Sequence, residues 1–268
     1  MIETAYAKIN LALHVRARRE DGYHEIETLF AFVDDGDVLS ARQAERDEIS
    51  LFGEFAREVG DPSGNFVAKA LDALPRLQGL SVTLEKNLPV AAGLGGGSAD
   101  AGAVFRMVRE LGGLPDDWQE RAARLGADVP ACVESNMAIG RGTGTELEGV
   151  DNDMAGMSVL LVNPRVPLST GPVFGLWHGE DRGAMPSGSA REIALGGRND
   201  LEAPAIALCP AIAEVLAALG ETGPLLARMS GSGATCFALY EQQDGLDGAV
   251  ELLASRHPEW WTLAGKLR

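Results

Sequence analysis

The residues most able to do chemistry lie in a glycine-rich segment, PVAAGLGGGSA, that follows a predicted strand at 80–84. An amphipathic helix with apolar residues from Ala101 to Leu111 comes next and stops at Gly112. Glycine allows a backbone to approach a phosphate closely and to adopt positive φ angles. Main-chain N–H groups and the positive end of the helix therefore converge on one point, which predicts an anion site. The residues of this segment are Pro89, Val90, Ala91, Ala92, Gly93, Leu94, Gly95, Gly96, Gly97, Ser98 and Ala99.

The glycine-rich segment does not match two common nucleotide-binding motifs. No Lys-Ser or Lys-Thr pair follows them, as a P-loop requires. A dinucleotide fingerprint needs a different glycine spacing and an acidic residue on the next strand. The alternative to an anion site is a helix-entry turn without a ligand. The preceding strand, the following helix and Ser98, whose hydroxyl is placed for a phosphate or a bound Mg²⁺ ion, favour the anion site.

The N-terminal residues alternate in polarity, which predicts a half-buried strand. Its polar face carries Lys8 and Asn10 side by side. A loop at 18–24 follows and ends in Tyr23 and His24, which offer a flat ring and a hydrogen-bonding edge. That pair suits a nucleobase, which needs stacking and edge recognition. Taken alone, the two residues fit a packed tyrosine and a solvated histidine better.

The remaining pattern predicts a mixed α and β protein with a domain boundary near residue 150, giving domains 1–150 and 151–268. A strand pair is expected to flank the turn-forming residues 34–37. Asn65 is expected to begin a helix, and another helix should span 118–125 and end at Gly126. The expected elements of the second half are a strand at 158–162, a loop at 163–197, a helix at 205–219, a strand at 235–240, a helix after 245 and a strand at 261–263.

Composition limits the partners of the chain. With 268 residues and 46% hydrophobic residues, the chain can bury a real core, and no apolar run approaches the length of a membrane span. The N-terminus does not resemble a signal peptide, and three scattered cysteines without metal-ligand spacing indicate a cytoplasmic protein. A net charge of −16 disfavours nucleic acid and anionic membranes as partners. It does not exclude an anionic substrate, because backbone N–H groups leave no trace in a charge count.

Three ordered motifs resemble those of the GHMP kinases, the superfamily that includes galactokinase, homoserine kinase and mevalonate kinase. They are AKINL at 7–11, the glycine-rich segment at 89–99, and MSGSGAT at 229–235. The resemblance implies an ATP-dependent small-molecule kinase with Mg²⁺ that arrives with ATP. It also implies an α+β fold with a ribosomal-protein-S5-domain-2-like N-terminal domain and a ferredoxin-like C-terminal α/β sandwich.

Within the family, the segments DGYHE at 21–25, GADVP at 126–130 and NDLE at 199–202 resemble one branch. Its substrate is a methylerythritol that carries cytidine diphosphate, and its reaction phosphorylates the 2-hydroxyl in non-mevalonate isoprenoid biosynthesis. The resemblance implies that Tyr23 and His24 recognise cytosine and that Phe174 lies across the base.

The resemblance also implies the remaining site roles. Asp128 would accept the proton of the substrate hydroxyl, and Lys8 would keep Asp128 ionised and stabilise charge on the γ-phosphate. Residues expected to bind substrate or nucleotide are Asn10, Gly231, Ser232 and Gly233 for the substrate, and Asn65 and Lys86 for ATP. A monomer or weak dimer is expected.

Two alternatives stay open. A different GHMP kinase activity has no use for a base-recognising pair, and a catalytically silent relative has no chemical reason to keep both Lys8 and Asp128. One departure from the family is Thr145, where relatives often carry glutamate, so no metal role is assigned to that position.

Overall fold

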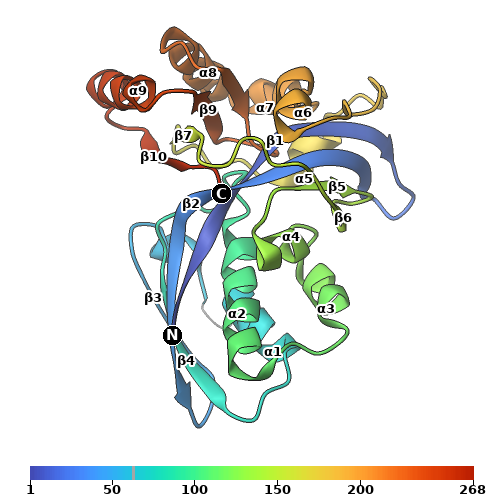
Figure 1. Cartoon of the computed structure of the whole chain (residues 1–268), viewed down its shortest axis with the longest axis vertical. Helices are drawn as coiled ribbons and strands as arrows, with labels where there is room; N and C mark the ends of the chain where they lie inside the picture. Colours follow the sequence, from blue (N-terminus) through green and yellow to red (C-terminus); the bar gives the residue numbers. More distant parts are fainter. Residues whose placement is uncertain (62–63) are drawn as a thin grey trace. The chain divides into compact units, whose positions relative to one another are not determined.

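The computed structural model describes residues 1–61 and 64–268, in which strands and helices combine in an α+β fold (Figure 1). Contacts between residues divide the chain into two compact units that do not follow chain order. Unit 1 consists of Met1–Lys8, Asp35–Val90 and Gly95–Asn136, and unit 2 of Ile9–Asp34, Ala91–Leu94 and Met137–Arg268. These units do not test the domains 1–150 and 151–268, which stay a prediction.

Two long strands, β1 (Ile2–Arg18) and β2 (His24–Ala44), contribute residues to both units. The predicted strand pair around residues 34–37 is wrong, because β2 continues through this segment. A Cβ atom on Gly36 would lie 2.1 Å from the carbonyl oxygen of Ala5, so glycine allows the close approach of β1 here. Strand pairing therefore overrides a local sequence that is typical of a turn.

The expectation that β1 is half-buried is also wrong. Lys8 and Asn10 are each 3% exposed, and His14 is fully buried. Each of these polar side chains has partners inside its own unit, so the polar face of β1 is buried at Lys8, Asn10 and His14, while Tyr6 is half-buried. Alternation of polar and apolar residues identified the strand but did not show which face meets water.

In unit 1, β3 (Glu48–Phe52) pairs in parallel with β4 (Gly79–Glu85), and β4 pairs antiparallel with the second part of β2. The helical elements of this unit are η1 (Ala56–Glu58), α1 (Phe66–Ala73), α2 (Gly96–Gly112), α3 (Trp118–Leu125) and α4 (Val129–Glu134). The predicted helix at 118–125 is confirmed, and Asn65 caps α1 through a hydrogen bond from Ala68 N–H at 2.9 Å. The apolar stripe of α2 is buried as far as Val108, with α1 and α4 packed against the helix, whereas Leu111 is 40% exposed.

In unit 2, β5 (Ala138–Arg141) pairs antiparallel with the first part of β2 and with β6 (Glu146–Gly149). A second, antiparallel sheet has the order β10–β7–β9–β8, with α8 and α9 packed on it as in the predicted ferredoxin-like layer (Figure 1). The other bounds are β7 (Ser158–Asn163), α5 (Thr170–Gly175), α6 (Ala190–Gly196), α7 (Glu202–Leu208), α8 (Ala211–Glu221), β8 (Leu226–Met229), β9 (Cys236–Tyr240), α9 (Gln243–Arg256) and β10 (Trp261–Lys266).

Two expectations in this unit need correction. The segment 163–197 is not a continuous loop, because it contains α5 and α6; a capping box between Ser189 and Glu192 begins α6. The helix expected at 205–219 is two helices that separate at Cys209 and Pro210, since proline cannot donate the hydrogen bond that would continue α7.

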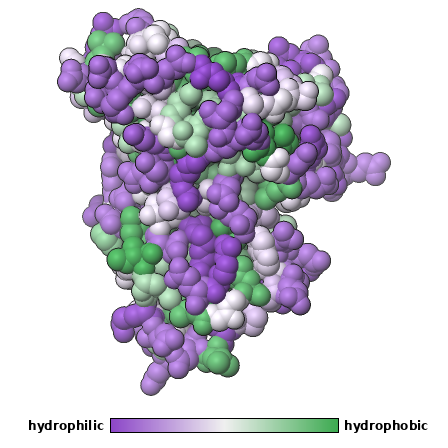
Figure 2. All heavy atoms as spheres, viewed as in Figure 1, coloured by the Kyte–Doolittle hydropathy of each residue, from purple (hydrophilic) through white to green (hydrophobic). Residues whose placement is uncertain are grey.

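Polar residues cover most of the face drawn in Figure 2, and apolar residues form only separate patches there. Among the helices of the described residues, none combines the length and the apolar composition needed to cross a membrane.

We predict opposite effects for two glycine-to-alanine changes in helices. A Cβ atom on Gly102 of α2 would lie 2.4 Å from the carbonyl oxygen of Cys132 in α4, whereas one on Gly248 of α9 would meet open space. Gly102→Ala should destabilise the protein by roughly 1–3 kcal/mol through overpacking, and Gly248→Ala should stabilise it by about 0.5–1 kcal/mol. Urea denaturation measures both; an unchanged free energy of unfolding for Gly102→Ala would contradict the close packing of α2 on α4.

Candidate active site

The predicted catalytic pair forms within unit 1. Lys8 on β1 and Asp128, the residue before α4, form an ion pair with 3.2 Å between Nζ and Oδ2. The lysine side chain is 4% exposed and the aspartate side chain 34%, so the carboxylate faces solvent and the ammonium does not. Asp128 occupies the N-cap position of α4, but its side chain makes no capping hydrogen bond. The carboxylate is therefore oriented by Lys8, and its catalytic role stays a prediction.

The start of α2 lies directly beside this pair. Gly95 takes a left-handed conformation with φ of 61°, and a Cβ atom there would lie 2.9 Å from Cε of Lys8. A Cβ atom on Gly97 would lie 2.8 Å from the ring of Phe66. The N–H groups of the first turn of α2 and Ser98 thus begin next to the Lys8–Asp128 pair, as an anion site requires.

The side-chain amide of Asn65 uses its oxygen but not its nitrogen for hydrogen bonding within the described residues. Its Oδ1 atom caps α1, while its buried Nδ2 atom has no hydrogen-bond partner among the described residues. An unsatisfied buried donor is costly, and a bound ligand would relieve that cost. The structure therefore leaves a donor free for the nucleotide contact that the sequence predicts for Asn65.

Lys86, which the resemblance places near the nucleotide, has a buried side chain paired with two carboxylates. It is 2% exposed, and its Nζ atom lies 2.5 Å from Oδ2 of Asp37 and 2.8 Å from Oδ2 of Asp100. Burial opposes its charge, but the Asp100 and Asp37 carboxylates outweigh burial and raise the pKa of Lys86. Burial also disfavours the charged form of Asp100, and for this carboxyl group it raises the pKa to about 7.

Unit 2 contains a second backbone cradle, formed by the predicted third motif. Asn10 N–H donates to Oγ of Ser230 at 3.2 Å, and the Ser230 hydroxyl donates to the carbonyl oxygen of Gly93 at 2.8 Å. A Cβ atom on Gly93 would lie 2.3 Å from the carbonyl oxygen of Ser230, so only glycine fits there. Gly231 and Gly233 adopt φ angles of 57° and 86°. Asn10 and the predicted 231–233 segment are therefore brought together.

Sequence reasoning missed two side chains that hold this cradle. Nδ2 of Asn199 donates to the carbonyl oxygens of Met229 and Gly231, at 2.8 Å each. Oγ1 of Thr170, at the start of α5, lies 2.9 Å from Oγ of Ser232. Asn199 lies in the recognised NDLE segment, which is the signal that could have identified it. Thr170 lies in the segment predicted to be a loop, and its position carried no comparable signal.

The predicted base-recognising residues form an aromatic group in unit 2. The His24 ring lies 4.8 Å from the Phe174 ring and 5.7 Å from the Trp177 ring, measured between centroids. Burial, with a smaller contribution from Arg18, lowers the pKa of His24 below 6.5, so the ring is neutral at pH 7. Its buried Nε2 atom has no hydrogen-bond partner within the described part of the chain. Tyr23 is 62% exposed at the turn before β2.

Trp177 is a third residue that the sequence did not indicate, because it follows the short helix α5 in a region without periodicity. It is 7% exposed and meets the His24 ring edge-on. Phe174, expected across a base from Tyr23, contacts His24 in this structure.

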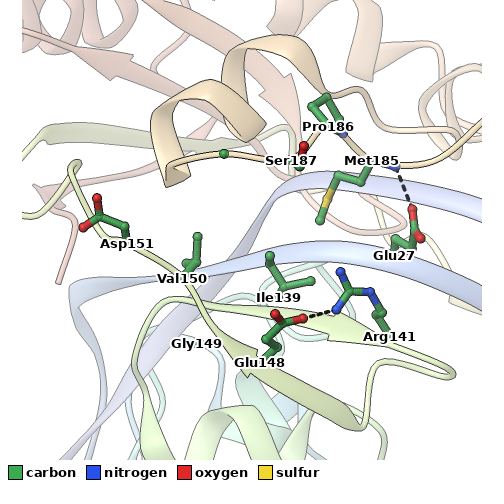
Figure 3. A pocket seen from close by; sticks show the side chains of 11 residues that line it. Glu27, Ile139, Arg141, Glu148, Gly149, Val150, Asp151, Met185, Pro186 and Ser187 are labelled. Atoms are coloured by element: carbon green, nitrogen blue, oxygen red, sulfur yellow. Dashed lines mark hydrogen bonds and ion pairs between the residues drawn. The ribbon is translucent and has the colours of Figure 1, made fainter.

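A pocket of about 270 Å³ also lies in unit 2, between β5, β6 and the segment 185–188 (Figure 3). None of the predicted site residues lines it. Two polar contacts lie within its lining, because Met185 N–H donates to Glu27 at 2.6 Å and Arg141 pairs with Glu148.

Two protein-family models match the chain. The GHMP kinases N terminal domain matches residues 65–136, and the GHMP kinases C terminal domain matches residues 185–257. The chain belongs to the GHMP kinase family. The predicted family, the predicted fold class and the prediction of an ATP-dependent kinase are thereby confirmed.

Two relatives that are similar over nearly their full length share one name, 4-diphosphocytidyl-2-C-methyl-D-erythritol kinase. The protein from Erythrobacter litoralis (strain HTCC2594) is 66% identical over 270 residues, with 99% of each chain covered. The protein from Novosphingobium aromaticivorans is 66% identical over 266 residues, which are 99% of this chain and 92% of the relative.

Solved structures agree with this result. The crystal structure of a 4-(cytidine 5'-diphospho)-2C-methyl-D-erythritol kinase superimposes with a TM-score of 0.83 at 33% identity, covering 100% of this chain and 99% of that one. A homoserine kinase from Cytophaga hutchinsonii has a TM-score of 0.68 at 17% identity, with 98% and 95% covered, and shares the fold.

We predict that Gly95→Ala impairs catalysis more than folding. The added methyl group would contact Cε of Lys8 and would force alanine into a left-handed conformation. A small displacement of Lys8 should lower kcat about tenfold or more. Gly112→Ala, at the other end of α2 where a Cβ atom meets open space, is the matched control. Equal kcat values for the two variants in steady-state assays would show that Gly95 does not set the position of Lys8.

Proposed function

We propose that this chain transfers the γ-phosphoryl group of ATP to the 2-hydroxyl of 4-diphosphocytidyl-2-C-methyl-D-erythritol, giving the 2-phosphate and ADP in isoprenoid precursor biosynthesis. The observation that carries this proposal is 66% identity, over the whole length, to kinases of that name. The positions of Lys8, Asp128 and the start of α2 support it independently, because they combine an anion site with a paired carboxylate.

The proposed reaction uses residues of unit 1. The N–H groups at the start of α2 hold the phosphates of ATP, and Asp128 accepts the proton of the substrate hydroxyl. The hydroxyl oxygen forms a bond with the γ-phosphorus while the bond to the β–γ bridging oxygen breaks, and ADP leaves. Lys8 keeps Asp128 ionised and offsets negative charge that develops during transfer.

Magnesium is proposed as the ion that accompanies ATP. Among the residues that the structure describes, no group of three or more His, Cys, Asp or Glu side chains is arranged to hold a metal. The Ser98 hydroxyl in the first turn of α2 fits an ion that keeps most of its ligands from phosphate and water. When bound, the ion would neutralise phosphate charge.

The proposed substrate contacts lie in unit 2. Asn10 and the 231–233 backbone would bind the substrate, and His24 would present its unpartnered Nε2 atom to the cytosine edge. Tyr23 and Phe174 supply aromatic surfaces for the base. We further propose a cytoplasmic monomer or weak dimer that acts on this small molecule without nucleic acid or membrane partners; the reduced, scattered cysteines and the charge of −16 support this.

ADP release should depend on both 4-diphosphocytidyl-2-C-methyl-D-erythritol and Mg²⁺, and a coupled assay measures it. Asp128→Asn should lower kcat about 100-fold or more, because the proton acceptor is lost, while both KM values stay within about threefold. Glu134→Gln, at the other end of α4, is the control and should keep full activity. Turnover of mevalonate or homoserine in place of the cytidine substrate would contradict the proposed substrate.

The KM for the cytidine substrate should depend on pH through His24. Because burial lowers its pKa below 6.5, the ring stays neutral at higher pH and gains a proton only as the pH falls below that value. KM should therefore be nearly constant above about pH 7.5, where a histidine with a lowered pKa is almost fully neutral, and should rise on acidification. His24→Gln keeps a polar edge but does not titrate, so its KM should be higher and independent of pH; a rise below pH 6.5 in this variant would assign the effect to another group.

A further inference from the structure

A buried group of three charges lies behind the start of α2. Lys86, the first residue after β4, donates to Oδ2 of Asp37 on β2 and to Oδ2 of Asp100 on α2. The three residues are 2%, 0% and 4% exposed, respectively. One ammonium therefore connects three separate elements of unit 1.

Asp37 also holds the backbone that leads into the glycine-rich segment. Its Oδ1 atom accepts hydrogen bonds from Asn87 N–H at 2.6 Å and from Leu88 N–H at 2.8 Å. These N–H groups follow the end of β4 and have left its ladder. The carboxylate of Asp37 thus fixes both the Lys86 side chain and the path of the next two residues.

The other side of the group faces α2. A Cβ atom on Gly96 would lie 3.1 Å from Nζ of Lys86, so the first residue of the helix rests against the ammonium. A cation at a helix N-terminus is unfavourable by itself, and the two carboxylates offset it. Oδ1 of Asp100 has no hydrogen-bond partner among residues 1–61 and 64–268.

We propose that Lys86 is a positioning residue, which ties the exit of β4 to the first turns of α2 and so holds the N–H groups of the glycine-rich segment in place for phosphate. Its ammonium acts through Asp37 and Asp100 and does not contact the nucleotide. Its ammonium would have to break two buried ion pairs to reach a ligand, which leaves two buried carboxylates without a cation. This inference rests on the proposed ATP site and changes the role expected of Lys86.

The test combines hydrogen exchange and kinetics on Lys86→Met. In the nucleotide-free protein, the N–H groups of Asn87, Leu88 and residues 99–101 should exchange about tenfold faster or more than in the unmodified protein, because their restraint is lost. The KM for ATP should rise about tenfold while kcat falls less than about threefold. Arg106→Met is the control: it removes another ion-paired cation, one that lies on α2 itself and pairs with Glu3 at 2.8 Å. It should lower stability and leave the KM for ATP unchanged.

The opposite result is equally distinct. If Lys86 binds ATP directly, hydrogen exchange of the nucleotide-free protein stays unchanged in Lys86→Met. The change in the KM for ATP is then also the same whether or not Asp100→Asn is present. Either finding overturns the proposal. A positioning role predicts strongly non-additive effects in that background. Should Lys86→Met not fold, Asp100→Asn alone must raise both the exchange rate and the KM for ATP, or the proposal fails. Failure of the unmodified protein to bind ATP would refute the proposed function. Hydrogen exchange in the nucleotide-free protein would still test whether Lys86 restrains the first turns of α2.

Discussion

Close backbone approach at the start of α2 is the constraint on which the candidate site depends. A run of glycines before a helix is usually explained by the phosphate in front of it. Here a Cβ atom on any of three glycines would also crowd a side chain of unit 1: Lys8 at Gly95, Lys86 at Gly96 and Phe66 at Gly97. A side chain at any of these positions would displace a different part of unit 1. The glycine sequence therefore reflects packing around the helix start as much as the ligand.

The second cradle follows the same physical rule in unit 2. Gly93 leaves no room for a side chain against Ser230, and the Ser230 hydroxyl closes the contact with a hydrogen bond. Asn199 then satisfies two carbonyl groups of the turn that would otherwise be buried without donors. Side-chain amides and hydroxyls thus replace the regular hydrogen bonds that a turn lacks, and they fix N–H groups in orientations that a ligand can use.

The sequence predicted the parts of the fold and site that depend on local pattern. Helix caps such as Asn65, the helix at 118–125 and the three family motifs belong to this group. It failed where tertiary contacts decide, as at Gly36, where pairing with β1 replaces a turn, and at Lys8 and His14, whose burial depends on residues far away in the chain. The site followed the same division. Lys8 and Asp128 lie in motifs that predicted the pair they form, whereas Asp37 and Trp177 contribute through distant contacts that no spacing reveals.

The exposure of Tyr23 has a thermodynamic consequence. Its ring stands 62% exposed on the turn before β2, while the neighbouring His24 is already covered by Phe174 and Trp177. A base that stacks on Tyr23 removes fresh apolar surface from water, whereas phosphates that meet N–H groups at the start of α2 remove little. Binding of the two proposed ligands should therefore differ in heat capacity, with the more negative change belonging to the cytidine compound.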